Sequence, residues 1–541
     1  MPGSAFSLVT RSAAPGIRLW PLGVPPIAPA ALQADGLFRR GSSSGHLATA
    51  AVLLLATALR LHDLGADPFW KNELFSMVWV RHPVDFLIGE GARIETNPPL
   101  HFLILKAWTA VFGTSEFAAR MPSLLAGVAA VVLVMRLGRE VAGPAIGLIA
   151  GLLLAVTPVH IVFAHEARAY ALLPVFALIG MLGASRLLHA AETAPGIPPI
   201  SASLLFGLGC AGLMHTHATG IFAATALGLA TLAALAGSAA PRPALIRLVA
   251  AGGLALAVAA PVLVAMALQS GSANIGWMPK LGLDTPVILN RYLLIGPMVR
   301  TDLGDDGSHI ELLSEMALGT ITALTLILLS LREIRAGRPR ALLVVFPLLF
   351  VALLAAVSVV RPVLIPRVAL WVSAPICLTA AMVLTGRLAW WLRAAAGVLL
   401  AACIGVGMWN NVIAPAQHKP DWRGLLAAQP PGIDGAVLVA GPHAGPLGIA
   451  FYANAPIIRP LRHWAPARDM PVTTADRLER GTAGATVVHT DELRELIEAG
   501  RGVVLYLDDD DEVLISRYLE AQPWFASARR GALPGLILFQ W

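Results

Sequence analysis

Residues 341–360 read ALLVVFPLLFVALLAAVSVV, twenty residues in a row without a charged side chain. About 20 apolar residues in a helix are needed to cross a hydrocarbon core of about 30 Å. Arginines stand directly outside this run, at Arg338 and Arg340 before it and at Arg361 after it. The stretch therefore predicts a transmembrane helix whose arginine-rich flank indicates its orientation.

The whole chain has the composition of this stretch. Of its 541 residues, 57% are hydrophobic and 13% are charged, with a mean hydropathy of +0.71, whereas soluble proteins carry about 25% charged residues. These values exclude a fibrous, disordered or disulfide-stapled protein. The net charge of +6 does not indicate nucleic-acid binding, because the arginines come in small groups between apolar runs. The chain is predicted to be a polytopic membrane protein.

Similar apolar runs predict eleven spans, near 46–62, 118–137, 143–160, 169–189, 200–217, 218–238, 245–268, 312–332, 341–360, 368–386 and 389–409. Arg39 and Arg40 put the N-terminus inside, and every short arginine-rich loop then falls on the cytoplasmic side. This threading requires residues 98–113, which are apolar but short, to lie in the interface without crossing. Twelve or thirteen spans are the alternatives.

Three parts are predicted from this topology. Residues 1–45, rich in Pro, Gly, Ala and Ser, are expected to be a disordered cytoplasmic tail. Residues 46–411 form the transmembrane domain, with a first outer loop at 63–117. Residues 412–541 alternate strand-like and helix-like segments, which predicts a small C-terminal α/β domain on the outer side. The expected strands are 436–440, 486–490, 503–507 and 536–539, with a helix at 491–499.

Ionisable side chains collect in two outer segments. Asp67 to Glu73 (DPFWKNE) follows the first span and is either an ordinary interfacial loop or a site in which a carboxylate acts as a general base. The second segment, His165 to Tyr170 (HEARAY), contains either a surface ion pair or an arginine that binds phosphate. Arg367 lies on the same predicted face, where an arginine suits an anionic head group. His215 and His217 do not share a helical face, so no metal site is predicted.

Six short motifs in order resemble the GT-C glycosyltransferases, and most closely the protein mannosyltransferase/aminoarabinose transferase type with the related lipopolysaccharide galacturonosyltransferases. The resemblance covers about 46–410. The motifs are WKNELFS at 70–76, NPPLH at 97–101, SEFAARMPSL at 115–124, HEARAYALL at 165–173, MHTHATG at 214–220 and Pro366-Arg367.

The resemblance implies a bacterial inner-membrane enzyme that transfers a sugar, with inversion, from a polyprenyl-phosphate donor to a periplasmic lipid, glycan or protein. The family carries an Asp-Glu pair in the first outer loop, and here the Asp position is Asn72, beside Glu73. An amide cannot accept a proton at neutral pH, so an impaired GT-C member is one alternative. A lipid-linked sugar flippase or transporter is the other alternative, although the charged side chains of a transporter are expected near the midplane of the membrane.

Site roles follow from the resemblance. Glu73 is the expected base, Asn72 orients the acceptor, and Glu166 is the reserve base. The donor phosphate is expected to contact Arg168, Arg367 and Lys71. The substrate is expected to contact His101, an aromatic position in the family, and His165, Tyr170 and His217. No cofactor is indicated, with a divalent metal as the open alternative, and no local motif specifies the sugar or the acceptor.

Overall fold

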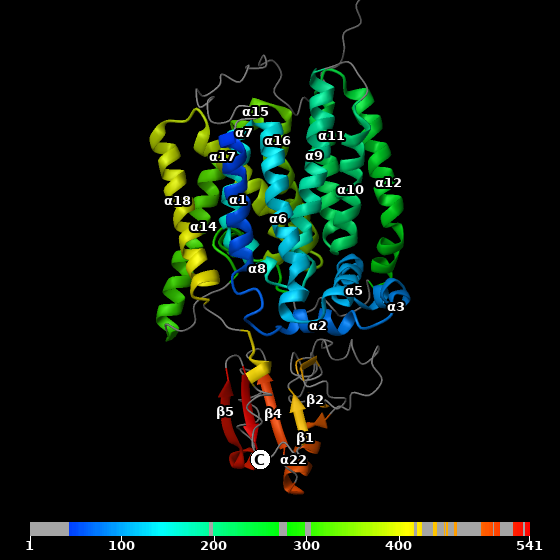
Figure 1. Cartoon of the computed structure of the whole chain (residues 1–541), viewed down its shortest axis with the longest axis vertical. Coiled ribbons are helices and arrows are strands. Elements are labelled where there is room, and N and C mark those ends of the chain that lie inside the picture. The colour runs from blue at the N-terminus through cyan, green and yellow to red at the C-terminus, as the bar shows by residue number, and fades with distance from the viewer. Residues whose placement is uncertain are drawn as a thin grey trace, which may run out of the picture.

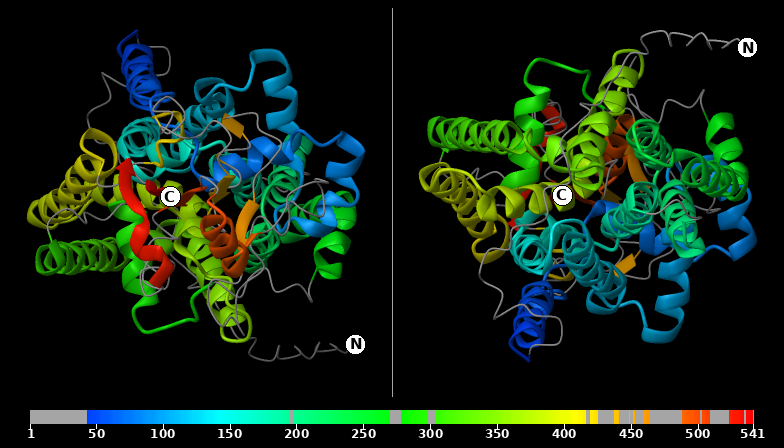
Figure 2. Two further views of the ribbon diagram at one scale, coloured as in Figure 1. Left: turned by 90° about the horizontal axis from the view of Figure 1, so that it is seen from below. Right: turned by 90° about the horizontal axis from the view of Figure 1, so that it is seen from above.

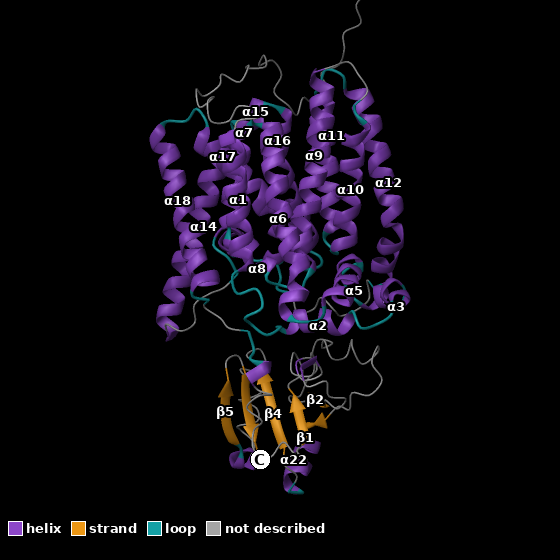
Figure 3. Ribbon diagram, in the orientation of Figure 1, coloured by secondary structure: helices purple, strands orange, loops and turns teal. Residues whose placement is uncertain are grey.

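The structure is a computed structural model (Figure 1). It describes residues 43–193, 198–269, 278–297, 304–415, 419–424, 437–440, 448, 451–452, 459–462, 488–500, 503–508, 523–533 and 536–540. Helices dominate these ranges, and the described strands all follow the last long helix (Figure 3). The predicted N-terminal tail, 1–45, lies outside the described residues except for 43–45, which begin helix α1.

Every one of the eleven predicted spans is helical. They correspond to α1 (Ser43–Leu61), α6 (Glu116–Val141), α7 (Pro144–Val156) with α8 (Pro158–Ala164), α9 (Leu172–Thr193), α10 (Ile200–Thr216), α11 (Gly220–Ala236), α12 (Pro241–Leu268), α14 (Gly304–Ser330), α16 (Arg338–Ser358), η2 (Pro366–Val372) with α17 (Ser373–Thr385), and α18 (Trp390–Met408). Among the described residues, eight helical segments are long and apolar enough to cross a membrane, or nine if α7 and α8 count as one. The chain is therefore a multi-span membrane protein. Because α10 and α11 have only 17 residues each, the number eleven stays a prediction.

Helix α5 (Leu100–Phe112) lies in the segment predicted not to cross. Its 13 residues give a length of about 20 Å, which is short of the hydrocarbon thickness. Figure 1 shows it beside α2 (Lys71–Trp79) and α3 (Val84–Ile88), at the end of the bundle nearest the strands. We call this the tail-side end. Three more short helices are α4 (Gly91–Ile94), α13 (Thr285–Leu294) and α15 (Glu333–Ala336), and α18 continues into a π-helical turn, η3 (Trp409–Ile413).

The break between α7 and α8 bends the chain by 61°. Pro158 has no N–H group to continue the helix, so carbonyls at the end of α7 lose their helical partners. Arg60, fully buried in the last turn of α1, donates to the carbonyls of Leu154 and Ala155 at 3.2 and 3.0 Å. Gly127 leaves room for it, since a Cβ there would lie 2.9 Å from Arg60 Nε.

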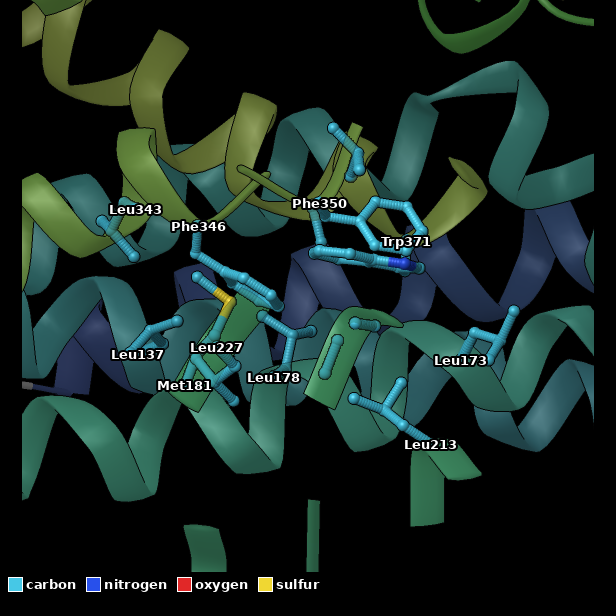
Figure 4. Close-up of a cluster of buried hydrophobic side chains, with 14 of the residues drawn as sticks. Leu137, Leu173, Leu178, Met181, Leu213, Leu227, Leu343, Phe346, Phe350 and Trp371 are labelled. Atoms are coloured by element: carbon cyan, nitrogen blue, oxygen red, sulfur yellow. The ribbon is translucent and has the colours of Figure 1, made fainter. Parts of the chain in front are cut away.

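The apolar core is built mainly from α6, α7, α9, α10, α11, α12, α16, η2 and α17, and Figure 4 shows a part of it. Met181 and Leu227 are buried there, and Trp371 packs on Phe346 and Phe350 with ring centroids 4.6 and 4.7 Å apart. Helices α1 and α18 are at the rim in both views along the bundle (Figure 2). Many of their apolar side chains are exposed, as expected for helices that face lipid.

The described part of the tail contains a six-stranded mixed sheet in the order β3-β2-β1-β4-β6-β5. Strand β1 is parallel to β2 and β4, β2 is parallel to β3, and β6 is antiparallel to β4 and β5. The elements are β1 (Val437–Ala440), β2 (Arg459–Arg462), β3 (Val488–His489), α22 (Thr490–Glu498), β4 (Val503–Asp508), η5 (Pro523–Ser527), β5 (Arg529–Leu533) and β6 (Leu536–Gln540).

Four of these strands and α22 coincide with predicted segments to within two residues at each end. Strands β2 (RPLR) and β5 (RRGAL) were not predicted. Their sequences lack the β-branched and aromatic residues that mark a strand, and pairing with neighbouring strands determines their conformation. Whether the tail is a separate domain stays a prediction.

Candidate functional site at the tail-side end

Glu73 is a fully buried carboxyl group at this end, with no exposed surface. It lies in the first turn of α2, where Oε2 accepts the N–H of Trp70 at 3.3 Å. Arg120 donates to both carboxylate oxygens, from Nε at 2.8 Å and from an Nη at 3.0 Å. Lys419 Nζ lies 3.0 Å from Oε2, and the N–H of Ala167 donates to Oε1 at 3.0 Å. Both oxygens therefore already have several donors.

Charge decides the ionisation of Glu73. Burial alone raises the pKa of a carboxyl group, but the charges of Arg120 and Lys419 and the hydrogen bonds to Oε1 and Oε2 outweigh it, and the pKa falls to about 2. Glu73 is thus a carboxylate at any physiological pH. A carboxylate with so low a pKa accepts a proton poorly.

Arg120, from α6, ties down the loop after α1. Besides Glu73 it donates to the carbonyls of Leu64 and Asp67, both at 2.9 Å, and of Pro68 at 3.0 Å. Its guanidinium also faces the ring of Phe69, 5.3 Å from the centroid. Every N–H of the fork therefore has a partner, so Arg120 fixes this loop.

Glu166 has the opposite environment. Its side chain is buried, and Oε2 has no hydrogen-bond partner among the described residues. Burial raises the pKa of Glu166 to about 7; Lys419 opposes the rise, the negative charge of Glu73 adds to it, and Arg367 and Arg168 also oppose it. A carboxyl group with this pKa exchanges protons readily near neutral pH.

The peptide groups around Glu166 are fixed by side chains from other segments. The carbonyl of His165 accepts from Lys419 Nζ at 3.3 Å, and the carbonyl of Ala167 accepts from His101 Nε2 at 3.1 Å. His165 Nε2 donates in turn to the carbonyl of Arg60 at 3.0 Å. The loop between α8 and η1 (Ala169–Ala171) is therefore held from several sides.

Arg168 and Arg367 both approach Glu166. Arg168 donates to Ser76 Oγ at 3.1 Å and to the backbone carbonyl of Asn72 at 3.4 Å, while its buried Nε has no hydrogen-bond partner among the described residues. The guanidinium of Arg367, from η2, lies 5.9 Å from the ring centroid of Tyr170. Lys71 and Asn72 begin α2 and are partly exposed.

His217 completes the cluster from the turn between α10 and α11. It is buried, its Nδ1 accepts the N–H of Thr219 at 3.1 Å, and its ring lies 5.8 Å from that of Tyr170. His215 instead donates from Nδ1 to Ala211 of its own helix at 2.8 Å. Within the described part of the chain, no three His, Cys, Asp or Glu residues are grouped so that they could hold a metal ion.

The tail contacts the first loop directly. The hydroxyl of Tyr452 accepts the N–H of Phe69 at 2.7 Å and donates to Glu116 Oε1 at 2.8 Å. The ring of Phe451 meets that of Phe69 edge to face, with centroids 5.3 Å apart. Arg423 adds an ion pair with Glu116 at 3.7 Å. The tail is thus part of this end of the molecule.

Most of the side chains singled out from sequence meet here. The structure brings together Glu73, Glu166, Arg168, Arg367, His101, His165, Tyr170 and His217, with Lys71 and Asn72 at the edge. Sequence reasoning did not single out Arg120 or Lys419. The sequence did indicate Arg120, because it is an arginine inside a predicted span and within one of the six motifs. Lys419 is one of four lysines and lies in no motif, so the sequence offers no such indication for it.

Comparison with known proteins supports the resemblance. Residues 96–265 match the family profile described as dolichyl-phosphate-mannose-protein mannosyltransferase. ArnT from Cupriavidus metallidurans, in the crystal structure bound to undecaprenyl phosphate, has a TM-score of 0.54 at 12% identity over 92% of this chain and 98% of ArnT. Its apo structure gives 0.52 at 14% identity over 92% and 97%. No curated protein matches the sequence significantly. The GT-C fold of the ArnT and mannosyltransferase type is confirmed, and it supports a membrane glycosyltransferase.

Proposed function

We propose that the protein transfers a sugar from a polyprenyl-phosphate donor to an acceptor on the periplasmic face, with inversion. The observation that carries the proposal is Glu166, a buried carboxyl group whose pKa is about 7 and on which the charges of Arg168 and Arg367 act. A proton acceptor next to two cations suits a reaction in which a hydroxyl attacks and a phosphate departs. The undecaprenyl phosphate bound to ArnT supports a donor of this class.

The arginines bind the donor phosphate in this proposal, with Lys71 as a third contact. Burying a phosphate without cationic partners is costly, and a guanidinium fork matches its oxygens. The unused Nε of Arg168 supplies a donor at this point. Cations on the departing phosphate also stabilise the charge that it gains in the transition state.

Glu166 is the base that the geometry favours. The sequence made Glu73 the first choice, but its lone pairs are occupied and its pKa is about 2. In the proposed reaction Glu166 takes the proton of the acceptor hydroxyl, and the oxygen attacks the anomeric carbon opposite the phosphate. The bond from that carbon to the phosphate oxygen breaks, and polyprenyl phosphate leaves with the electron pair. Glu73 positions the loop, and the amide of Asn72 orients the acceptor.

The remaining side chains of the cluster line the sugar position. Tyr170 and His217 offer neighbouring rings for it. His101 and His165 are neutral at pH 7, because burial, with Arg168 near His101 and Lys419 near His165, lowers their pKa to about 3 and about 4. Neutral imidazoles contact a sugar without adding charge.

A flippase remains a competing function because one span is broken, at Thr157–Pro158, as in many transporters. The carbonyls at this break bind Arg60, whereas a transporter would use them for its cargo. A labelled lipid-linked sugar in proteoliposomes separates the cases. Release of polyprenyl phosphate supports transfer, and movement of the lipid without cleavage supports a flippase. If neither release nor movement occurs, the result supports an impaired enzyme, the alternative that Asn72 favours.

Donor affinity gives one test of the phosphate contacts. Arg168→Ala and Arg367→Ala are each expected to weaken binding of a short polyprenyl phosphate about 10- to 100-fold, since a hydrogen bond to a charged group contributes about 1.5–3 kcal/mol. Titration calorimetry in detergent measures this. Arg361→Ala, which removes an arginine six residues before Arg367, is the control. Unchanged affinity in both variants would remove the arginines from the phosphate site.

Topology gives another test. We propose eleven spans in the bacterial inner membrane, a cytoplasmic N-terminal tail at 1–45, a transmembrane domain at 46–411 with its first periplasmic loop at 63–117, and a periplasmic α/β domain at 412–541. A reporter active only in the periplasm, fused after Trp409, is therefore expected to be active. Activity of a cytoplasm-only reporter at the same position would contradict the threading.

A further inference from the structure

We propose that Lys419, in the segment after the last membrane helix, is a positioning residue whose ion pair with Glu73 holds the backbone on both sides of Glu166. The tail thereby completes the site. This inference takes the role of Glu166 as the base from the proposed function. The contacts of Lys419 that carry it are independent of that function.

The contacts form a clamp. Lys419 Nζ bridges Glu73 Oε2 at 3.0 Å and the carbonyl of His165 at 3.3 Å. The other oxygen of Glu73 accepts the N–H of Ala167 at 3.0 Å. One partner of the ion pair therefore holds the residue before Glu166, and the other holds the residue after it. Displacing either partner frees one flank of the carboxyl group.

The segment that carries Lys419 is itself fixed. The side chain of Trp422 is buried, and its backbone N–H donates to the carbonyl of Pro420 at 2.9 Å. Arg423 pairs with Glu116 and also donates to the carbonyl of Ala66. The ammonium group of Lys419 is therefore delivered by an anchored turn, which lowers the entropy lost in holding a long side chain.

Lys419 also acts on Glu166 through charge. The charges that influence Glu166 come from four segments: Glu73 from α2, Arg168 from its own loop, Arg367 from η2, and Lys419. Tyr292 of α13 is also near, and burial together with the charge of Glu166 raises the pKa of its hydroxyl. Among these, Lys419 opposes the raised pKa of Glu166 most strongly. Its removal raises that pKa further.

The kinetic test is Lys419→Met, which keeps the length and removes the charge. We expect kcat to fall about 10- to 100-fold, the loss that accompanies a misplaced reacting group, with little change in the donor KM because Lys419 is not assigned to the phosphate. A base works deprotonated, so the acidic limb of the kcat profile moves to higher pH. Lys419→Arg restores the limb. Arg494→Met, which removes a half-exposed cation from α22 of the tail, leaves it in place.

A second readout needs no substrate. Amide hydrogen exchange over residues 163–170, in lipid nanodiscs, is expected to be faster in Lys419→Met, above all at Glu166, whose N–H belongs to the peptide group that Lys419 holds through the His165 carbonyl. The rate is expected to return towards the wild-type value in Lys419→Arg. If exchange responds in this way while the wild type transfers no sugar, the proposed function fails and the clamp stands. Unchanged exchange in Lys419→Met overturns the clamp, whatever the activity.

Discussion

Glu166→Gln is expected to lower the rate of sugar transfer about 10²- to 10⁴-fold, the usual contribution of a general base, while the donor still binds. The substitution keeps the size of the side chain and removes its ability to accept a proton at neutral pH. Release of polyprenyl phosphate from a labelled donor measures transfer, and calorimetry measures binding. Glu140→Gln, in an ion pair with Arg186 at the opposite end of α6, is the matched control.

The pH dependence of the wild type separates the two carboxyl groups. A base with a pKa of about 7 gives a rate that rises with pH through neutrality and levels off above it. Glu73, with a pKa of about 2, would give no such limb in this range. Full transfer by Glu166→Gln, or a flat profile from pH 5 to pH 8, would return the base role to Glu73.

Arg120→Met is expected to lower the free energy of unfolding by about 3–5 kcal/mol, the cost of removing one partner of a buried ion pair. The variant leaves Glu73 buried with Lys419 as its remaining cation, and it strips three loop carbonyls of their donor. Thermal unfolding in detergent measures the loss. Because the pKa of Glu73 is lowered from 4.5 to about 2, the stabilisation is complete above about pH 4.5 and disappears as the pH falls through 2.

A second variant keeps this result interpretable. Removing both partners, in Glu73→Gln combined with Arg120→Met, is expected to destabilise less than the sum of the two single changes, since no uncompensated charge remains. Purely additive losses would show that the two side chains do not act as a pair. Wild-type stability of Arg120→Met alone would contradict the anchoring role of Arg120.

Apolar length and arginine placement made the helices predictable. The run at 341–360 has no charged residue and the run at 389–409 has one, Arg393, and such runs identify spans without knowledge of their packing. The strands β2 and β5 were not predictable, because RPLR and RRGAL adopt the extended form only through pairing with β1 and β6. In these strands tertiary pairing overrides local preference.

The candidate site was predictable as a set of residues but not as a set of roles. Glu73 and Glu166 are both carboxylic acids near aromatic residues and arginines, and the sequence favoured Glu73. The two carboxyl groups differ in pKa because Glu73 is paired with Arg120, 47 residues away in the sequence, and with Lys419, 346 residues away. Contacts between residues so far apart in the sequence depend on helix packing. Local sequence therefore does not reveal which carboxyl group is paired with cations and which one titrates near neutral pH.

The position of η2 and α17 has a consequence for biogenesis. These are the most enclosed membrane segments, with α17 packing against α7, α14, α16 and α18. They emerge from the ribosome only after more than 360 residues have been made. Earlier helices therefore wait in the bilayer without their central partner, with the bulky side chains of Phe346 and Phe350 still unpacked. We therefore expect assembly to be a late event, and chains truncated before Pro366 to be loosely packed and open to membrane proteases.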